Sequence, residues 1–260
     1  MVKLGLQAAR RLATASAVLA LSIPTASADL ELPPDATGDV SGAPTWTQFL
    51  VDIRDHIPDV PLDIRYHTDY NFIGRKIDAY NAPKCLLTRK AAEALAAVQE
   101  ELGTRSMSIK IYDCYRPQMA VDQFVLWAQD LDDEKMKEQF YPNVAKDQLF
   151  ADGYIASQSG HSRASTVDLT IVPLPVPEQT PCRAGSPCED NGIDMGTPFD
   201  YFDPKSHAIS ADVSEEQQAN RELLHLVMLR HGFTYYPAEW WHFTIRDEPY
   251  PDTYFNFPIE

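Results

Sequence analysis

The sequence predicts an α+β fold, because helical and strand patterns follow one another without a regular strand–helix–strand rhythm. Apolar residues recur at helical spacing in residues 86–102, whereas apolar and polar residues alternate in residues 107–111 and 166–172. Hydrophobic residues make up 44% of the 260, enough for a sizeable core. Since no linker-like segment divides residues 46–260, we expect one compact domain with a small antiparallel sheet flanked by helices.

Three helices and three strands are predicted. In chain order they are the helix 86–102, the strand 107–111, a helix beginning at Pro117, the strand 166–172, a helix beginning after Ser214 and the strand 240–246. Pro117 suits the start of a helix because proline lacks the backbone N–H that is unpaired there anyway. Ser214 and Gln217 have capping-box spacing. Gly103 and Gly232 stand where two of the helices would end.

The first 28 residues are typical of a secretory signal. A basic start leads into an apolar stretch, Leu12–Ile23, and a small-x-small pattern ends at Ala28. The apolar stretch is too short to cross a bilayer comfortably, and Pro24 interrupts it. We therefore expect export to the periplasm or the medium, cleavage after Ala28 and no stable membrane association afterwards. Residues 29–45 are rich in Pro, Gly, Ala and Asp and are expected to be a mobile spacer.

The chain is acidic, with a formal charge of −16 at pH 7. The leader contains basic residues and no acidic ones, so the exported part is more acidic still. Such a protein repels nucleic acid and anionic membrane surfaces, which excludes both as expected partners.

Four cysteines in an exported chain favour two disulfides. Cys182 and Cys188 bracket a short loop that contains proline and glycine, which makes them the first pair. Cys85 and Cys114 then form the second. The alternative is a zinc site built from cysteines, but no two are spaced as C-x-x-C.

Polar residues on two of the predicted strands suggest a metal site. Asp168 and His242 each alternate with apolar neighbours, so each points away from an apolar face. His161 lies in a Gly160-containing loop before the first of these strands, where glycine favours a tight turn. Glu239 reaches the same site only if the chain bends near Pro237. Spacing alone does not separate this interpretation from histidines with structural hydrogen bonds, and both remain open at this level.

Several segments resemble the D-alanyl-D-alanine dipeptidases of the vancomycin-resistance type. Residues 159–170 (SGHSRASTVDLT) resemble the family pattern S-x-H-S-R-G-x-x-x-D-L-T, and residues 239–243 resemble its E-W-W-H segment. Residues 113–117 (DCYRP) are similar to its D-G-Y-R-P segment, and residues 195–200 and 246–251 match two further blocks. These similarities run in family order from about Asp63 to the C-terminus.

The resemblance implies a mechanism. His161, Asp168 and His242 would hold one zinc ion, although iron or cobalt suits similar ligands. Glu239 would accept a proton from the attacking water and pass it to the leaving amine. Arg116 would stabilise the negative charge that develops on the carbonyl oxygen.

The resemblance also places Tyr66, Ser159 and Asp200 near the bound dipeptide. Asp200 would pair with the substrate ammonium or orient Arg116, although it also suits a turn cap, and Ser159 also suits a purely local role in its loop. Two departures stand out. Ala164 occupies a family glycine position, and the segment that contains Cys182 and Cys188 resembles an insertion, which we expect to narrow or cover the mouth of the site.

The function implied is zinc-dependent hydrolysis of D-alanyl-D-alanine, a small-molecule substrate, in cell-wall peptide turnover or salvage. A zinc D,D-carboxypeptidase or endopeptidase that acts on longer peptidoglycan peptides is the first alternative, because related enzymes share the ligand pattern. A non-catalytic zinc protein that binds wall fragments is the second. It would need neither Glu239 nor Arg116, and structural zinc sites usually have four protein ligands.

Overall fold

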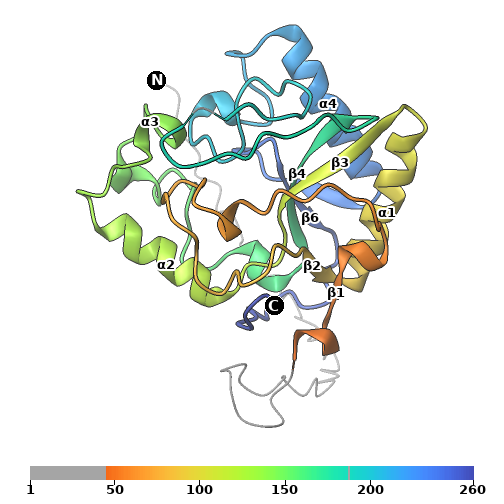
Figure 1. Cartoon of the computed structure of the whole chain (residues 1–260), viewed down its shortest axis with the longest axis horizontal. Coiled ribbons are helices and arrows are strands. Elements are labelled where there is room, and N and C mark those ends of the chain that lie inside the picture. The colour runs from red at the N-terminus through yellow and green to blue at the C-terminus, as the bar shows by residue number, and fades with distance from the viewer. Residues whose placement is uncertain (1–44, 187) are drawn as a thin grey trace, which may run out of the picture. The chain divides into compact units, whose positions relative to one another are not determined.

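The structure is a computed structural model that describes residues 45–186 and 188–260, so the predicted leader and all of the predicted spacer except Thr45 lie outside the described residues. A four-stranded antiparallel sheet has the strand order β3-β4-β6-β5 (Figure 1). A smaller antiparallel sheet pairs β1 with β2. The predicted α+β fold with small antiparallel sheets and flanking helices is confirmed.

All three predicted strands and all three predicted helices are present. The strands are β1 (Leu50–Asp52), β2 (Leu86–Thr88), β3 (Met107–Asp113), β4 (Thr166–Pro173), β5 (Phe233–Tyr235) and β6 (His242–Ile245). The helices are α1 (Arg89–Gly103), α2 (Gln118–Gln129), α3 (Lys137–Phe140) and α4 (Glu215–Arg230). Figure 1 shows α1 and α4 on one side of the larger sheet and α2 and α3 away from them. None of these helices is both long and apolar enough to cross a bilayer.

The first helix begins later than its periodicity predicts. Leu86 to Thr88 form β2, which pairs with β1, and α1 begins only at Arg89. The Thr88 hydroxyl caps the helix by accepting a hydrogen bond from the Ala91 backbone N–H at 3.4 Å. Buried apolar residues suit a strand as well as a helix, so the apolar pattern does not show where β2 ends and α1 begins.

The predicted starts of the other two helices are confirmed. Pro117 directly precedes α2, and both capping-box hydrogen bonds between Ser214 and Gln217 are present at the start of α4. Helical spacing predicts one apolar face for α2, made of Val121, Phe124, Val125, Ala128 and Leu131. This is wrong at Leu131, which is 54% exposed because the helix has already ended. Trp127 occupies a buried position on that helix instead.

Strand β4 lies between β3 and β6 and is buried on both faces from Thr166 to Val172. The alternation is as predicted, with Val167 and Leu169 in the hydrophobic core. Asp168 points to the opposite face, yet it is only 2% exposed, because that face also is covered by protein. A carboxylate in such a place needs a cation or hydrogen-bond donors beside it, and β4 therefore positions the candidate site.

Candidate active site

His161 lies in a single 3-10 turn, Gly160–Arg163, just before β4. The Ser159 hydroxyl begins this turn by accepting a hydrogen bond from the His161 backbone N–H at 3.2 Å. Nδ1 of His161 lies 2.7 Å from the backbone carbonyl oxygen of Cys114. A carbonyl oxygen only accepts, so Nδ1 carries a proton and Nε2 is the nitrogen left for a metal ion. The buried imidazole is thereby oriented by the backbone of a distant segment.

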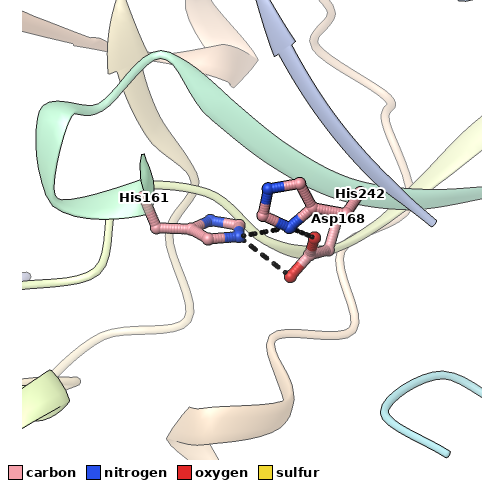
Figure 2. A group of neighbouring side chains, drawn as sticks. All are labelled: His161, Asp168 and His242. Atoms are coloured by element: carbon pink, nitrogen blue, oxygen red, sulfur yellow. Dashed lines mark hydrogen bonds and ion pairs between the residues drawn. The ribbon is translucent and has the colours of Figure 1, made fainter. Parts of the chain in front are cut away.

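Asp168 and His242 are direct register partners in the β4–β6 ladder. Oδ1 of Asp168 lies 3.2 Å from Nδ1 of His242, and Oδ2 lies 3.2 Å from Nε2 of His161. The two imidazole nitrogens lie 3.3 Å apart. Figure 2 shows the three side chains pointing toward a common centre.

These three side chains fit a metal ion. Ligand atoms arranged tetrahedrally about 2.0 Å from a zinc ion lie about 3.3 Å from one another. The two imidazole nitrogens are 3.3 Å apart, and each lies 3.2 Å from one of the two Asp168 oxygens. Oδ1 of Asp168 is buried and has no hydrogen-bond partner among the described residues, as expected of an oxygen that faces a cation. The hydrogen bond from His161 to the Cys114 carbonyl is the support that a metal-ligating histidine usually has.

Glu239 reaches the same place because the chain bends before β6. The backbone N–H of Tyr236 donates to the carbonyl of His242 at 3.0 Å, and that of Glu239 donates to the carbonyl of Tyr236 at 3.2 Å. Oε2 of Glu239 then lies 3.4 Å from Nδ1 of His242. The bend expected near Pro237 is therefore present, and the carboxyl group stands beside the candidate metal ligands.

Arg116 faces the same pocket and is held by Asp113. Both its Nε, at 3.0 Å, and its Nη2, at 2.9 Å, contact Oδ2 of Asp113. The Tyr80 hydroxyl donates to the other oxygen of this buried carboxylate at 2.8 Å. The Arg116 guanidinium lies 4.8 Å from the ring centre of Tyr66, and its Nη2 is 3.7 Å from Oδ2 of Asp168.

The three residues expected near the substrate line the same cavity of about 270 Å³. The Tyr66 hydroxyl donates to Oδ2 of Asp200 at 2.8 Å. Arg116 is thus oriented by Asp113, and Asp200 takes its hydrogen bond from Tyr66. Ser159 lines the pocket and also caps the His161 turn. The other walls include one loop, residues 153–156 and 158–160, and the aromatic side chains Phe72, Phe124, Phe202 and Tyr236.

The pocket concentrates acidic side chains. Burial raises the pKa of Glu239 well above its usual range, and the nearby carboxylates of Asp168 and Asp200 add to the rise. Burial and then the charge of Asp168 raise the pKa of Asp200 to about 8. Burial would also raise the pKa of Asp168, but His161 and His242 outweigh it and the pKa is lowered. Among the described residues that line the cavity, Arg116 is the one permanent cation. A divalent metal ion would therefore favour the ionised forms of these carboxyl groups.

In the turn that carries His161, backbone strain is at Ala164, whereas Gly160 is needed for close packing. Ala164 adopts the left-handed conformation, with φ of 55°, directly after the His161 turn. Gly160 has no positive φ, but a Cβ there would lie 2.9 Å from the Thr166 hydroxyl oxygen. Gly160 therefore permits close packing, whereas the departure from the family glycine at Ala164 falls where the backbone favours glycine.

We expect Ala164→Val to lower the free energy of unfolding by about 3 kcal/mol, because a β-branched residue adds strain at positive φ and overfills a fully buried site. Ala164→Gly is the control and should change it by less than about 1 kcal/mol, since relief of strain is offset by a lost methyl contact and a more flexible unfolded chain. Urea unfolding of both variants measures this. A valine variant as stable as the wild type would contradict the assigned backbone conformation.

Both predicted disulfides are present, Cys85–Cys114 and Cys182–Cys188. The expectation that the Cys182–Cys188 segment narrows the active-site mouth is wrong, because none of its described residues lines that cavity. Cys188 instead borders another cavity. Asp190 holds the segment aside by accepting hydrogen bonds from Lys110 and Arg65, each at 2.9 Å.

Sequence patterns missed Asp113 and Tyr236 as site residues. Asp113 stands three residues before Arg116 in a recognised motif, so its opposite charge at that spacing was an available signal. Tyr236 follows the short strand β5, and no periodic pattern distinguishes it from a core aromatic. It lines the cavity, and its hydroxyl donates to the Gly153 carbonyl at 3.2 Å.

Comparison with known proteins agrees with this geometry. A family model described as D-ala-D-ala dipeptidase matches residues 47–260. The chain is 40% identical over 197 residues to a D-alanyl-D-alanine dipeptidase of Streptomyces coelicolor, covering 76% of this chain and 91% of that protein. It is 38% identical to one of Enterococcus faecalis, with the same coverage, and 31% identical to one of Escherichia coli, covering 76% and 86%. The chain therefore belongs to the D-ala-D-ala dipeptidase family of metallopeptidases.

Proposed function

We propose that this protein is a zinc-dependent dipeptidase that hydrolyses D-alanyl-D-alanine to D-alanine. One observation carries the proposal: three candidate ligands, a buried carboxyl group and an arginine converge on one cavity in a chain of this family. Two histidines and one carboxylate leave a coordination position open, as in catalytic zinc sites. A cavity of about 270 Å³ suits a substrate as small as a dipeptide.

Glu239 is the general base in this proposal. When bound, zinc polarises the scissile carbonyl and lowers the pKa of the water beside it. The Glu239 carboxylate, next to His242, accepts a proton from that water and later delivers it to the leaving amine. His161, Asp168 and His242 act only as ligands.

Arg116 and Asp200 supply the charges that the substrate needs. The Arg116 guanidinium, held by Asp113, donates hydrogen bonds to the carbonyl oxygen as negative charge develops there. Asp200, fixed by Tyr66, pairs with the ammonium group of the dipeptide. Ser159 forms part of the wall beside His161. A free amine is therefore a requirement for substrates.

We further propose that residues 1–28 direct export and are removed, which leaves a catalytic domain of residues 46–260 after a short spacer, in the periplasm or the medium. Outside the cytoplasm the enzyme would release D-alanine from wall turnover for salvage. Interception of wall precursors would require a cytoplasmic enzyme.

The test is D-alanine release by the purified protein, with zinc and after chelation. We expect zinc-dependent hydrolysis of D-alanyl-D-alanine and none of L-alanyl-L-alanine. N-acetyl-D-alanyl-D-alanine should have a kcat/KM at least about 100-fold lower, because it leaves buried Asp200 without its ammonium partner. The two dipeptides serve as matched controls for stereochemistry and for the free amine.

Other outcomes have definite meanings. Equal turnover of the acetylated compound would favour the carboxypeptidase alternative and contradict the role given to Asp200. If a folded, zinc-loaded protein hydrolyses none of these compounds, the dipeptidase proposal fails, and peptides from the cell wall become the next substrates to test.

A further inference from the structure

We infer that the Cys85–Cys114 disulfide is a positioning element of the active site, which holds both the imidazole of His161 and the guanidinium of Arg116 in place. The catalytic part of this inference rests on the proposed function, but the metal-binding part does not. The inference concerns a covalent bond whose two cysteines do not line the cavity.

The segment from Asp113 to Arg116 supports the site in two directions. The Cys114 carbonyl accepts the hydrogen bond from Nδ1 of His161 at 2.7 Å, which directs Nε2 toward Asp168. Two residues later, the Arg116 backbone N–H donates to the His161 carbonyl at 3.3 Å. A shift of this segment would therefore move one candidate ligand and the arginine together.

The disulfide ties that segment to β2. Cys85 directly precedes Leu86, the first residue of β2, and its carbonyl accepts a hydrogen bond from the Ile53 backbone N–H at 2.9 Å. The Tyr115 backbone N–H donates to the Leu86 carbonyl at 3.0 Å. The S–S bond adds the covalent link between Cys85 and Cys114, whose Cα atoms are 5.1 Å apart. The Asp113–Arg116 segment is thus joined to the β1–β2 sheet by one hydrogen bond and one covalent bond.

The space around the bond is closed. Cys85 is 0% exposed and Cys114 is 1% exposed, and both belong to the hydrophobic core. Without the bond, two sulfur atoms would have to separate to a non-bonded distance inside a close-packed interior, which resists small displacements. The easiest accommodation is movement of the Cys114 segment, because it has ended its regular pairing in β3.

This support rests on a departure from the family pattern. The family pattern D-G-Y-R-P has glycine where this chain has Cys114, and glycine cannot form the bond. The second disulfide offers an internal comparison, since none of the described residues of the Cys182–Cys188 segment lines the active-site cavity. Its loss should affect stability without affecting His161 or Arg116.

The experiment compares Cys85→Ala/Cys114→Ala and Cys85→Val/Cys114→Ala with the control Cys182→Ala/Cys188→Ala. The valine variant refills the core without restoring the bond, so it separates the covalent constraint from a packing defect. Three quantities are measured in the full chain: zinc affinity by competition with a chromophoric chelator and no substrate, kcat and KM for D-alanyl-D-alanine, and thermal unfolding of the metal-free protein.

We expect both Cys85/Cys114 variants to fold and to bind zinc about 10- to 100-fold more weakly, the usual effect of disturbing support behind a metal-ligating histidine. Their kcat at saturating zinc should fall at least about tenfold, with little change in KM, because a small displacement of Arg116 acts mainly on the transition state. The control should keep zinc affinity and kcat within about twofold.

Wild-type zinc affinity and kcat in folded Cys85/Cys114 variants would overturn the inference. Loss of the fold in both variants would overturn it too, because the bond would then serve the core as a whole. An equal loss of zinc affinity in the control would show a general effect of disulfides. If the wild-type chain does not hydrolyse the dipeptide, the proposed function fails, yet the zinc measurements still decide the positioning of His161.

Discussion

Replacing Glu239 by glutamine should lower kcat for D-alanyl-D-alanine about 1000-fold and leave zinc bound. General acid–base catalysis contributes about 10²- to 10⁴-fold, and an amide cannot accept the proton of the attacking water. The side chain is 8% exposed, and its Oε2 lies 3.4 Å from Nδ1 of His242, close to the reacting groups without being one of the three clustered candidate ligands. Glutamine has nearly the same shape, so the pocket should keep its geometry.

The measurement pairs steady-state kinetics with zinc content. Glu222→Gln, an exposed position on α4, is the matched control and should behave as the wild type. A Glu239→Gln enzyme that keeps more than about a tenth of the wild-type kcat would assign the base to another group. Loss of zinc in that variant would instead mark Glu239 as a ligand.

Replacing Arg116 by methionine should lower kcat about 100- to 1000-fold with zinc still bound, the usual effect of removing a donor that stabilises an oxyanion. The substitution should also lower the stability of the fold. Asp113 would lose the cation that contacts its Oδ2 at 2.9 and 3.0 Å, and an unpaired buried carboxylate costs about 3 to 5 kcal/mol of stability. Urea unfolding must therefore accompany the kinetics.

Arg116→Lys separates charge from geometry. Lysine keeps the positive charge but not the planar fork that contacts Asp113 through two nitrogens. We expect a kcat between those of the wild type and the methionine variant, with stability partly recovered. If the methionine variant folds and turns over at the wild-type rate, Arg116 has no role in the transition state.

The fold was predictable wherever one local pattern was sufficient. The capping box at Ser214 located the start of α4, and the alternation around Asp168 located β4. The start of α1 was not predictable, because Leu86 and Leu87 are buried in either a strand or a helix. Only their pairing with β1, more than thirty residues earlier, decides between the two.

The three candidate metal ligands were predictable individually, but their arrangement was not. Alternation placed Asp168 and His242 opposite apolar faces, and family resemblance joined them to His161. Their register as direct partners depends on long-range strand pairing that neither strand specifies alone. The support of Arg116 by Asp113 was missed although the two residues are only three apart in the sequence. The hydrogen bond from Tyr80 to Asp113 spans 33 residues, and no local pattern predicts it.

Because Asp168 pairs directly with His242, zinc binding depends on the register between β4 and β6. A slip of one residue between β4 and β6 would bring Phe243 or Trp241 opposite Asp168 and turn His242 to the other face. In a chain with that error, Asp168 and His242 would no longer face the same metal ion. Zinc would therefore bind only molecules with the correct register and would shift the folding equilibrium toward them by mass action. Zinc stoichiometry in a refolded preparation therefore reports the fraction of chains whose sheet has closed in the right register.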